Sequence, residues 1–406
     1  MLVEFKFRNF LSYKDTASLL MTRVKSFKEL EDTTIIKTEH FDLLKTAILY
    51  GSNGGGKTNL VRAIGFMRNV IRNSFAESLK KEEDRKSNSA PYFKLSEISE
   101  KEPSMFEVTF IQDKILYRYG FEIKGIEIEK EWLVRKKDTE TMLFERKKNK
   151  IKINKSGFSE GEKFKDNVNS NVLFLSYLAQ HNGELSSKIF NWFRKVNVVS
   201  GLQNVHFNNV TKHLLEDSEN FRKWLSIAVK FLNITSLSLG KENRIIAHHN
   251  KFDKNEIIKG TIGFDLEKEE SEGSVKLIYL LGAIYYCLQN GCIFFIDEFD
   301  SKLHPNLTKR LIEFFHKLNK NNTQFILTAL DSILLDKEFF RRDQIWFVDK
   351  NKFGSSELYS MSEFDASVVR NTSDFRKKYL DMNFGAANTI DISEKLIGLM
   401  YGKQSK

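Results

Sequence analysis

The chain contains few of the residues that build disulfide frameworks, metal clusters and rigid loops. Its 406 residues include two cysteines and three prolines. Cys287 and Cys292 lack metal-site spacing and stand in apolar surroundings, which predicts core thiols in a reducing, cytoplasmic setting. The longest apolar run, residues 275–288, is too short and too polar to span a bilayer. The N-terminus alternates like a strand and is unlike a signal peptide, so we expect no membrane partner.

Two further absences narrow the function. The sequence has no sustained heptad pattern, so we expect no long coiled-coil arm. It also has no Glu…Asp-x-Asp arrangement of the Toprim nuclease type after Val348. Apolar residues nevertheless make up 41% of the chain, which is enough for a large core. The net charge of +10 suits a nucleic acid or an acidic phage protein as partner, although lysine-rich proteins without such partners share it.

The stretch around which the chain is organised spans residues 48–60, which predict a buried strand, a glycine-rich turn and the start of a helix. Residues 51–58 fit G-x-x-x-x-G-K-[ST], the phosphate-binding P-loop. Glycines let backbone N–H groups cradle phosphate oxygens, and the helix start adds positive potential. A glycine-rich turn that matched the motif by chance would not be expected to have an apolar strand before it and a helix after it. We expect ATP to contact Gly51, Ser52, Asn53, Gly54, Gly55, Gly56, Lys57, Thr58 and Asn59.

Two of these residues have further predicted roles. Lys57 would reach the β- and γ-phosphates as a catalytic residue, and the Thr58 hydroxyl would bind Mg²⁺. Residues 292–298 then supply an apolar run that ends in two acids, as in a buried parallel strand of Walker B type. Asp297 would lie near the Mg²⁺, and Glu298 would polarise the attacking water as general base. Together the two motifs predict an ATPase.

The remaining patterns predict an α/β protein with a mixed sheet. Residues 1–22 form a hairpin, residues 104–153 alternate as an antiparallel β meander, and residues 160–232 carry apolar residues at helical spacing. We expect an N-terminal ATPase lobe over 1–155, a helical insertion over 156–235 and a C-terminal ATPase lobe over 236–406. The meander tips are basic, which fits either a nucleic-acid stripe or strand-edge lysines that block aggregation.

Residues 271–274, Ser-Glu-Gly-Ser, resemble the S-x-G signature of ABC-type ATPases of the SMC and recombination-repair group. Residues 299–305 resemble the D-loop of the same group. The resemblance implies a P-loop NTPase fold of ABC-ATPase type, in which Ser271 and Gly273 contact ATP held by another subunit. Two ATP molecules are then sandwiched between protomers, so we expect at least a homodimer. The simpler interpretation of Ser271 is a helix N-cap.

A closer resemblance is to short prokaryotic ATPases of abortive-infection and anti-phage loci, of the AbiLi, RloA and AriA type. Residues 7–13, 341–348 and 383–386 carry it, with Asn383 in place of the usual Arg. It implies an ATP-hydrolysing sensor that controls a neighbouring-gene toxin or nuclease. A DNA-binding repair or recombination ATPase, and an ATP-dependent scaffold with little turnover, are the alternatives.

Two positions depart from the pattern of these relatives. Leu330 stands where they have a histidine that contacts the γ-phosphate. Leucine cannot donate a hydrogen bond, so we expect slow hydrolysis. A Q-loop glutamine is not assigned, because Gln112 falls in a predicted hairpin turn.

Overall fold

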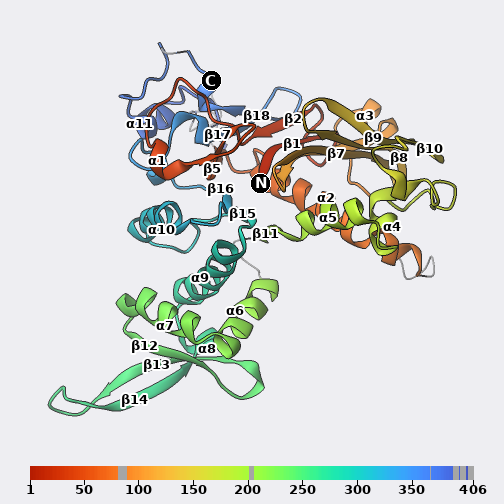
Figure 1. Ribbon diagram of the computed structural model, residues 1–406. Helices are drawn as coiled ribbons and strands as arrows, with labels where there is room; N and C mark the ends of the chain where they lie inside the picture. The colour runs from red at the N-terminus through yellow and green to blue at the C-terminus, as the bar shows by residue number, and fades with distance from the viewer. Residues whose placement is uncertain (81–88, 201–204, 366, 387–392, 394–398, 401–406) are drawn as a thin grey trace.

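The computed structural model describes residues 1–80, 89–200, 205–365, 367–386, 393 and 399–400 (Figure 1). A six-stranded sheet carries the motifs, with five parallel strands and one antiparallel edge strand, β18. In spatial order its strands are β11 (Val196–Ser200), β15 (Ile293–Asp297), β16 (Gln324–Thr328), β5 (Thr46–Gly51), β17 (Ile345–Lys350) and β18 (Ser356–Ser360).

The central strand β5 is buried on both faces. Ala47 and Leu49 point into a core shared with helix α2 (Lys57–Ser78), whereas Ile48 and Tyr50 point into a second core shared with helices α9 (Glu272–Asn290) and α10 (Pro305–Leu318). A strand covered on both sides needs apolar residues at every position, which explains why its sequence does not alternate. This double covering fixes where β5 ends and the glycine-rich turn begins.

A seven-stranded antiparallel sheet covers the other side of α2. The predicted N-terminal hairpin and β meander are both confirmed in it, and left-handed residues Asp113, Lys114 and Gly125 make the turns. In spatial order the strands are β10 (Lys150–Ile153), β9 (Glu140–Lys147), β8 (Glu127–Lys136), β7 (Ile115–Lys124), β6 (Ser104–Gln112), β1 (Leu2–Arg8) and β2 (Ala17–Leu20).

A third, three-stranded sheet lies beyond the helix α9. It consists of β12 (Ile234–Leu239), β13 (Ile245–Phe252) and β14 (Ile258–Asp265), with α6 (Val205–Asp217), α7 (Glu219–Ala228) and α8 (Leu266–Glu269) beside it. Figure 1 shows the β13–β14 hairpin reaching away from the rest of the molecule. The remaining elements are α1 (Glu31–Thr34), β3 (Ile35–Lys37), β4 (Asp42–Leu44), α3 (Glu97–Lys101), α4 (Phe174–Gln180), α5 (Glu184–Arg194) and α11 (Phe375–Leu380).

A buried carboxylate joins the meander to the helices that follow it. Glu131 on β8 accepts hydrogen bonds from the backbone N–H groups of Phe174 (2.6 Å) and Leu175 (3.0 Å) at the start of α4. Burial raises the pKa of Glu131, and the nearby Arg146 guanidinium, 3.8 Å away, opposes that shift. The pair is fully enclosed, so loss of one partner would leave an uncompensated buried charge.

The structure differs from the sequence-based expectations in two places. The segment 156–235 is not wholly helical, because residues 196–200 form β11 at the edge of the parallel sheet, next to β15. A short run such as Val-Asn-Val-Val-Ser cannot be told from part of a helix by periodicity alone. The sequence also predicts that the helix after the glycine-rich turn ends near Arg72, whereas helix α2 continues six residues further, to Ser78. Among the described helices, none is long and apolar enough to cross a membrane.

Candidate nucleotide-binding site

The phosphate loop, residues 51–58, connects the end of β5 to the start of α2. Gly51, Gly54 and Gly56 have φ angles of 155°, 78° and 126°, which favour glycine. A Cβ at Gly51 would lie 2.1 Å from the carbonyl oxygen of Val348 on the adjacent strand β17. The close approach of the two backbones therefore demands glycine at the first position of the motif.

Hydroxyl groups brace the phosphate loop from the β18 side. Ser356 Oγ lies 2.5 Å from the Gly55 carbonyl oxygen and 2.8 Å from Ser12 Oγ. Asn59 Nδ2 donates to the same Ser12 Oγ at 2.8 Å. The side chain of Asn59, a predicted ATP contact, therefore helps to hold Ser12 against the phosphate loop. Sequence reasoning missed Ser12 and Ser356 as site residues, because their adjacency to the loop arises only from the sheet order.

Lys57, the first residue of α2, is folded against the phosphate loop. Its Nζ donates to the carbonyl oxygens of Gly51 (2.6 Å) and Ser52 (3.1 Å). Burial lowers the pKa of Lys57, and the carboxylates of Asp297 and Glu298 are among the groups that oppose the shift. The structure thus brings the predicted lysine of the P-loop and the predicted acids of Walker B into one electrostatic site.

Thr328 sets the geometry of the two acids. Strand β16 lies between β5 and β15 and ends at Thr328. The Thr328 Oγ1 donates to Asp297 Oδ1 at 2.6 Å and accepts from the Glu298 backbone N–H at 2.8 Å. Glu298 has a left-handed backbone with φ of 49°, which turns the chain sharply after β15. A single hydroxyl therefore joins the carboxylate of the predicted metal ligand to the backbone of the predicted general base.

The residues available for a metal ion are oxygen donors, as Mg²⁺ prefers. Asp297 is buried, and its Oδ2 forms no hydrogen bond with a described residue. Asp300 is also buried, and its Oδ1 has no hydrogen-bond partner among the described residues. Thr58 is half-buried in the first turn of α2. These residues fit the Mg²⁺ that accompanies ATP.

The signature residues begin helix α9 and lie against the post-β15 loop, residues 298–304. Ser271 is the N-cap, and its Oγ accepts from the Ser274 backbone N–H at 3.1 Å. A Cβ at Gly273 would lie 2.8 Å from the Lys302 carbonyl oxygen. Among the described residues, no hydrogen bond or ion pair joins residues 271–274 to the phosphate loop of the same chain.

Lys276 fastens the signature helix to the post-β15 loop. It lies in the second turn of α9, and its Nζ donates to the carbonyl oxygens of Glu298 (2.9 Å), Phe299 (3.2 Å) and Ser301 (2.7 Å). Burial lowers its pKa to about 8, against the opposing charges of Asp300 and Glu298. Sequence reasoning missed Lys276, although its place three residues after Gly273 put it on the same helix end.

Leu330 follows β16 on the surface beside these groups. Its side chain is 47% exposed, and its backbone N–H donates to Asp300 Oδ2 at 2.8 Å. Asp331 N–H donates to the same oxygen at 2.6 Å. Burial raises the pKa of Asp300, and these two N–H groups oppose that shift. The backbone at position 330 is therefore well anchored, while its side chain has no polar group to offer.

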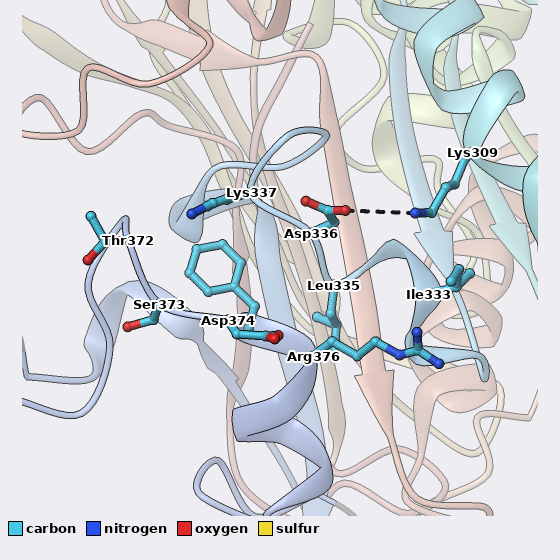
Figure 2. A pocket seen from close by; sticks show the side chains of 10 residues that line it. Lys309, Ile333, Leu335, Asp336, Lys337, Thr372, Ser373, Asp374 and Arg376 are labelled. Atoms are coloured by element: carbon cyan, nitrogen blue, oxygen red, sulfur yellow. Dashed lines mark ion pairs between the residues drawn. The ribbon is translucent and has the colours of Figure 1, made fainter.

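A separate pocket of about 320 Å³ lies near the C-terminal helix α11 (Figure 2). In it, the Nζ of Lys309 and an Oδ2 of Asp336 are 3.7 Å apart. None of the residues predicted for nucleotide binding lines this pocket, so it is not part of the phosphate site. Its lining residues are Lys309, Ile333, Leu335, Asp336, Lys337, Thr372, Ser373, Asp374, Phe375 and Arg376.

Comparison with solved structures finds SMC head domains. An "SmcHead bound to the C-winged helix domain of ScpA" is 13% identical with a TM-score of 0.45, covering 88% of this chain and 97% of that one. An "SMC head domain from Thermotoga maritima" is 15% identical with a TM-score of 0.42, covering 88% and 98%. An Smc head domain with an extended coiled coil, bound to the C-terminal domain of ScpA derived from Pyrococcus furiosus, is 14% identical with a TM-score of 0.40, covering 88% and 96%.

Comparison at the level of sequence identifies the family. No curated protein matches significantly. The profile of the family described as "AAA domain, putative AbiEii toxin, Type IV TA system" matches residues 47–329, which is more than half of the chain. The match runs from β5 past the end of β16 and includes the phosphate loop, the signature and both acids. With its P-loop, mixed sheet and antiparallel meander, the chain has an α/β fold of P-loop type and belongs to this family of AAA-domain proteins.

Proposed function

We propose that this protein is an ATP-hydrolysing regulator in a prokaryotic anti-phage, abortive-infection system, and that it controls a separately encoded effector in the cytoplasm. The observation that carries the proposal is the fastening of the signature to the post-β15 loop. The backbone of Gly273 lies close to the Lys302 carbonyl oxygen, and Lys276 donates to the carbonyl oxygen of Glu298, the proposed general base. A nucleotide that touches the signature is therefore coupled to the groups that would hydrolyse another.

The chemistry follows from the positions of the side chains. In this proposal Lys57 binds the β- and γ-phosphates, and Glu298 polarises a water in line with the γ-phosphate. Thr58 and Asp297 would hold Mg²⁺, which when bound neutralises charge on the phosphate oxygens. Thr328 orients Glu298 through the backbone N–H of that residue. Comparison of phosphate release by the wild type and by Glu298→Gln tests hydrolysis; equal rates would contradict it.

The composite site requires a second protomer. The Ser271 hydroxyl and the α9 N-terminus form the kind of positive helix end that binds anions, yet they make no hydrogen bond to the phosphate loop of their own chain. We therefore propose that ATP joins two copies face to face, with each signature on the other copy's γ-phosphate. Nucleotide state would then control association.

Mass measurement with and without ATP tests this assembly. Glu298→Gln, which slows hydrolysis, should be dimeric or larger with ATP. Adding Ser271→Arg should return it to the ATP-free mass, because the long cation fills the shared surface. Ser236→Arg, on the exposed face of β12, is a matched control and should assemble normally. An oligomeric mass that changes neither with ATP nor with Ser271→Arg would contradict the proposal that ATP joins two protomers.

A separate effector is supported by two observations. Residues 341–348 and 383–386 resemble anti-phage ATPases, and no Toprim-type acidic arrangement follows Val348. The test is co-purification with the product of the adjacent open reading frame. A complex whose mass changes with ATP supports control of an effector, whereas full activity of that product without this protein, and no complex, would contradict it.

Leu330 favours a second candidate, an ATP-dependent scaffold with little turnover. Without a donor at position 330, ATP could hold protomers together for long periods. The two candidates differ in the rate of ATP-driven disassembly. If the wild type and Glu298→Gln keep their ATP-bound mass equally long after free ATP is removed, the scaffold is the better description.

Clamping of DNA on the meander finds less support. Two lysines of the basic strand tips are paired with neighbouring carboxylates, which reduces the free positive charge there. These pairs are Lys147–Glu145 (3.1 Å) and Lys148–Glu129 (3.7 Å). Duplex binding with a steep salt dependence would revive this alternative.

A further inference from the structure

The phosphate loop has different neighbours on its two sides. Strands β16 and β15 lie on one side of β5 and carry Thr328, Asp297 and Glu298. Strands β17 and β18 lie on the other side, and the turn 351–355 joins them. A γ-phosphate that is attacked by a water activated by Glu298 must lie toward β15. The nucleoside end of the same ligand must therefore leave the loop toward the β17–β18 turn.

The β17–β18 turn is attached directly to the phosphate loop. Ser356, the first residue after the turn, has its Oγ 2.5 Å from the Gly55 carbonyl oxygen. Within the turn, Asn351 Oδ1 accepts from the N–H groups of Phe353 (3.0 Å) and Ser355 (3.1 Å). Ser355 Oγ also accepts from the Lys14 N–H at 3.1 Å. Phe353 is thus presented on a turn whose ends and interior are both held in place.

Phe353 exposes a large aromatic ring at this position. The residue is 69% exposed, and Lys352 Nζ lies 5.0 Å from the centroid of the ring. Leu95, which is 71% exposed, lies against the same turn, since a Cβ at Gly354 would be 2.7 Å from Leu95 Cδ1. Tyr13 also reaches the loop, but its ring is buried and its hydroxyl donates to the Gly56 carbonyl oxygen at 3.2 Å. Phe353 and Leu95 are therefore two exposed apolar side chains at the turn that is attached to the phosphate loop.

We propose that Phe353 is the stacking platform for the base of the bound nucleoside triphosphate, with Leu95 at its edge. Lys352 lies over one face of the ring, and the base stacks on the other, so that the ring is held between a cation and a second π system. Stacking area, not hydrogen bonding, sets the preference, and purines bind more tightly than pyrimidines. This inference rests on the proposed binding of ATP at the phosphate loop.

The test separates base contacts from phosphate contacts. The affinities of ATP, CTP and inorganic tripolyphosphate are measured by calorimetry for the full chain and for Phe353→Ala. Loss of the platform should weaken ATP about tenfold, leave tripolyphosphate within about twofold, and reduce the preference for ATP over CTP. Phe353→Tyr should keep the wild-type values, because it retains a ring of the same size. Phe252→Ala is the matched control: Phe252 is 56% exposed on the distant β13–β14 hairpin.

Each outcome decides between the two levels of the proposal. If the wild type binds neither ATP nor tripolyphosphate, the proposed nucleotide site itself fails. If it binds both, and Phe353→Ala binds ATP as tightly as the wild type, only the platform fails. An equal loss for ATP and tripolyphosphate also overturns the platform, since it would show that the substitution disturbs the phosphate loop. A drop of the same size in Phe252→Ala would overturn it as well.

Discussion

The two walls of the phosphate site differ in their chemistry. On the β18 side, neutral groups brace the loop: the hydroxyls of Ser12 and Ser356 and the amide of Asn59. On the β15 side, charged groups hold the chain around the two acids: half-buried Lys276 binds the post-β15 loop, and buried Asp300 binds the backbone after β16. Burial lowers the pKa of Lys276 to about 8 and raises that of Asp300. The neutral wall is insensitive to pH and salt, whereas the charged wall responds to nearby charge.

This difference indicates where control of the site resides. A triphosphate brings several negative charges next to Lys276, Asp300 and Glu298, and a second protomer brings more. The neutral wall positions the ligand in the same way at all times. The charged wall is the part whose energy changes when ligand or partner arrives, so it is the part suited to a switch.

The largest expected effect comes from Lys57→Ala, which removes the one cation that both walls share. Two charge-assisted contacts to phosphate are lost, so ATP affinity should fall about 100-fold or more by calorimetry. Lys268→Ala, at an exposed position of α8, is the control and should bind normally. Tight ATP binding by Lys57→Ala would refute the assignment of the phosphate loop.

Glu298→Gln should separate binding from turnover. An amide cannot accept the proton of the attacking water, so phosphate release should fall about 100-fold or more. ATP affinity should stay within about threefold of the wild type, because the neutral wall and Lys57 are intact. Glu338→Gln, at an exposed acid beyond β16, should behave like the wild type. If binding falls together with turnover, Glu298 holds the ligand and is not only the base.

Lys276→Met should disconnect the signature from the general base. Its hydrogen bonds to three carbonyl oxygens and to Ser301 Oγ in the post-β15 loop are lost, and turnover should fall about tenfold with little change in ATP affinity. Lys276→Arg keeps the charge and should retain most of the activity. An unchanged rate in Lys276→Met would show that the post-β15 loop is held by other contacts.

The same lysine predicts opposite trends of turnover and stability with pH. Because the pKa of Lys276 in the folded protein is about 8, its ammonium loses a proton as pH rises through 8, and turnover should fall there. In the unfolded chain the lysine keeps that proton up to about pH 10.5. The contribution of this group to the free energy of unfolding therefore increases as pH rises from about 8 to about 10.5. Lys276→Arg should keep its turnover through this range. Parallel pH profiles of the wild type and Lys276→Arg would contradict the assignment.

The smallest effect is expected for Leu330→His, which places a donor on the charged wall. A neutral hydrogen bond to the γ-phosphate should raise turnover about fivefold. Stability should hardly change, because the side chain is half-exposed and its backbone stays anchored to Asp300. Steady-state phosphate release measures the gain; no gain would show that the missing donor does not limit hydrolysis.

The sequence was sufficient to predict the parts of the fold and site that are encoded locally. Residues 51–58 and 292–298 are contiguous motifs, and each occupies one strand and the turn after it, so their positions followed from pattern alone. The β meander was predictable because half-buried antiparallel strands alternate. The strand β11 was not, since its five residues become a strand only by pairing with β15.

The remaining site residues could not be predicted because distant segments supply them. Ser12 and Ser356 meet at the phosphate loop although 344 positions separate them along the chain. Lys276 looks like an ordinary polar position on an apolar helix until the fold places three carbonyl oxygens around its ammonium. Phe353 is one of 35 phenylalanines, and only its exposure on a braced turn distinguishes it from the others.

The contacts of Lys276 also have a mechanical consequence. They join the start of α9 rigidly to the post-β15 loop. Helix α9 also packs against α6 and α7, which together with α8 and the strands β12–β14 form an outlying lobe. A rotation of that lobe about the parallel sheet would carry Glu298 with it and move the base out of line with the γ-phosphate. The orientation of the lobe would then decide whether hydrolysis can occur: one orientation would permit it and others would prevent it, without any change at the phosphate loop.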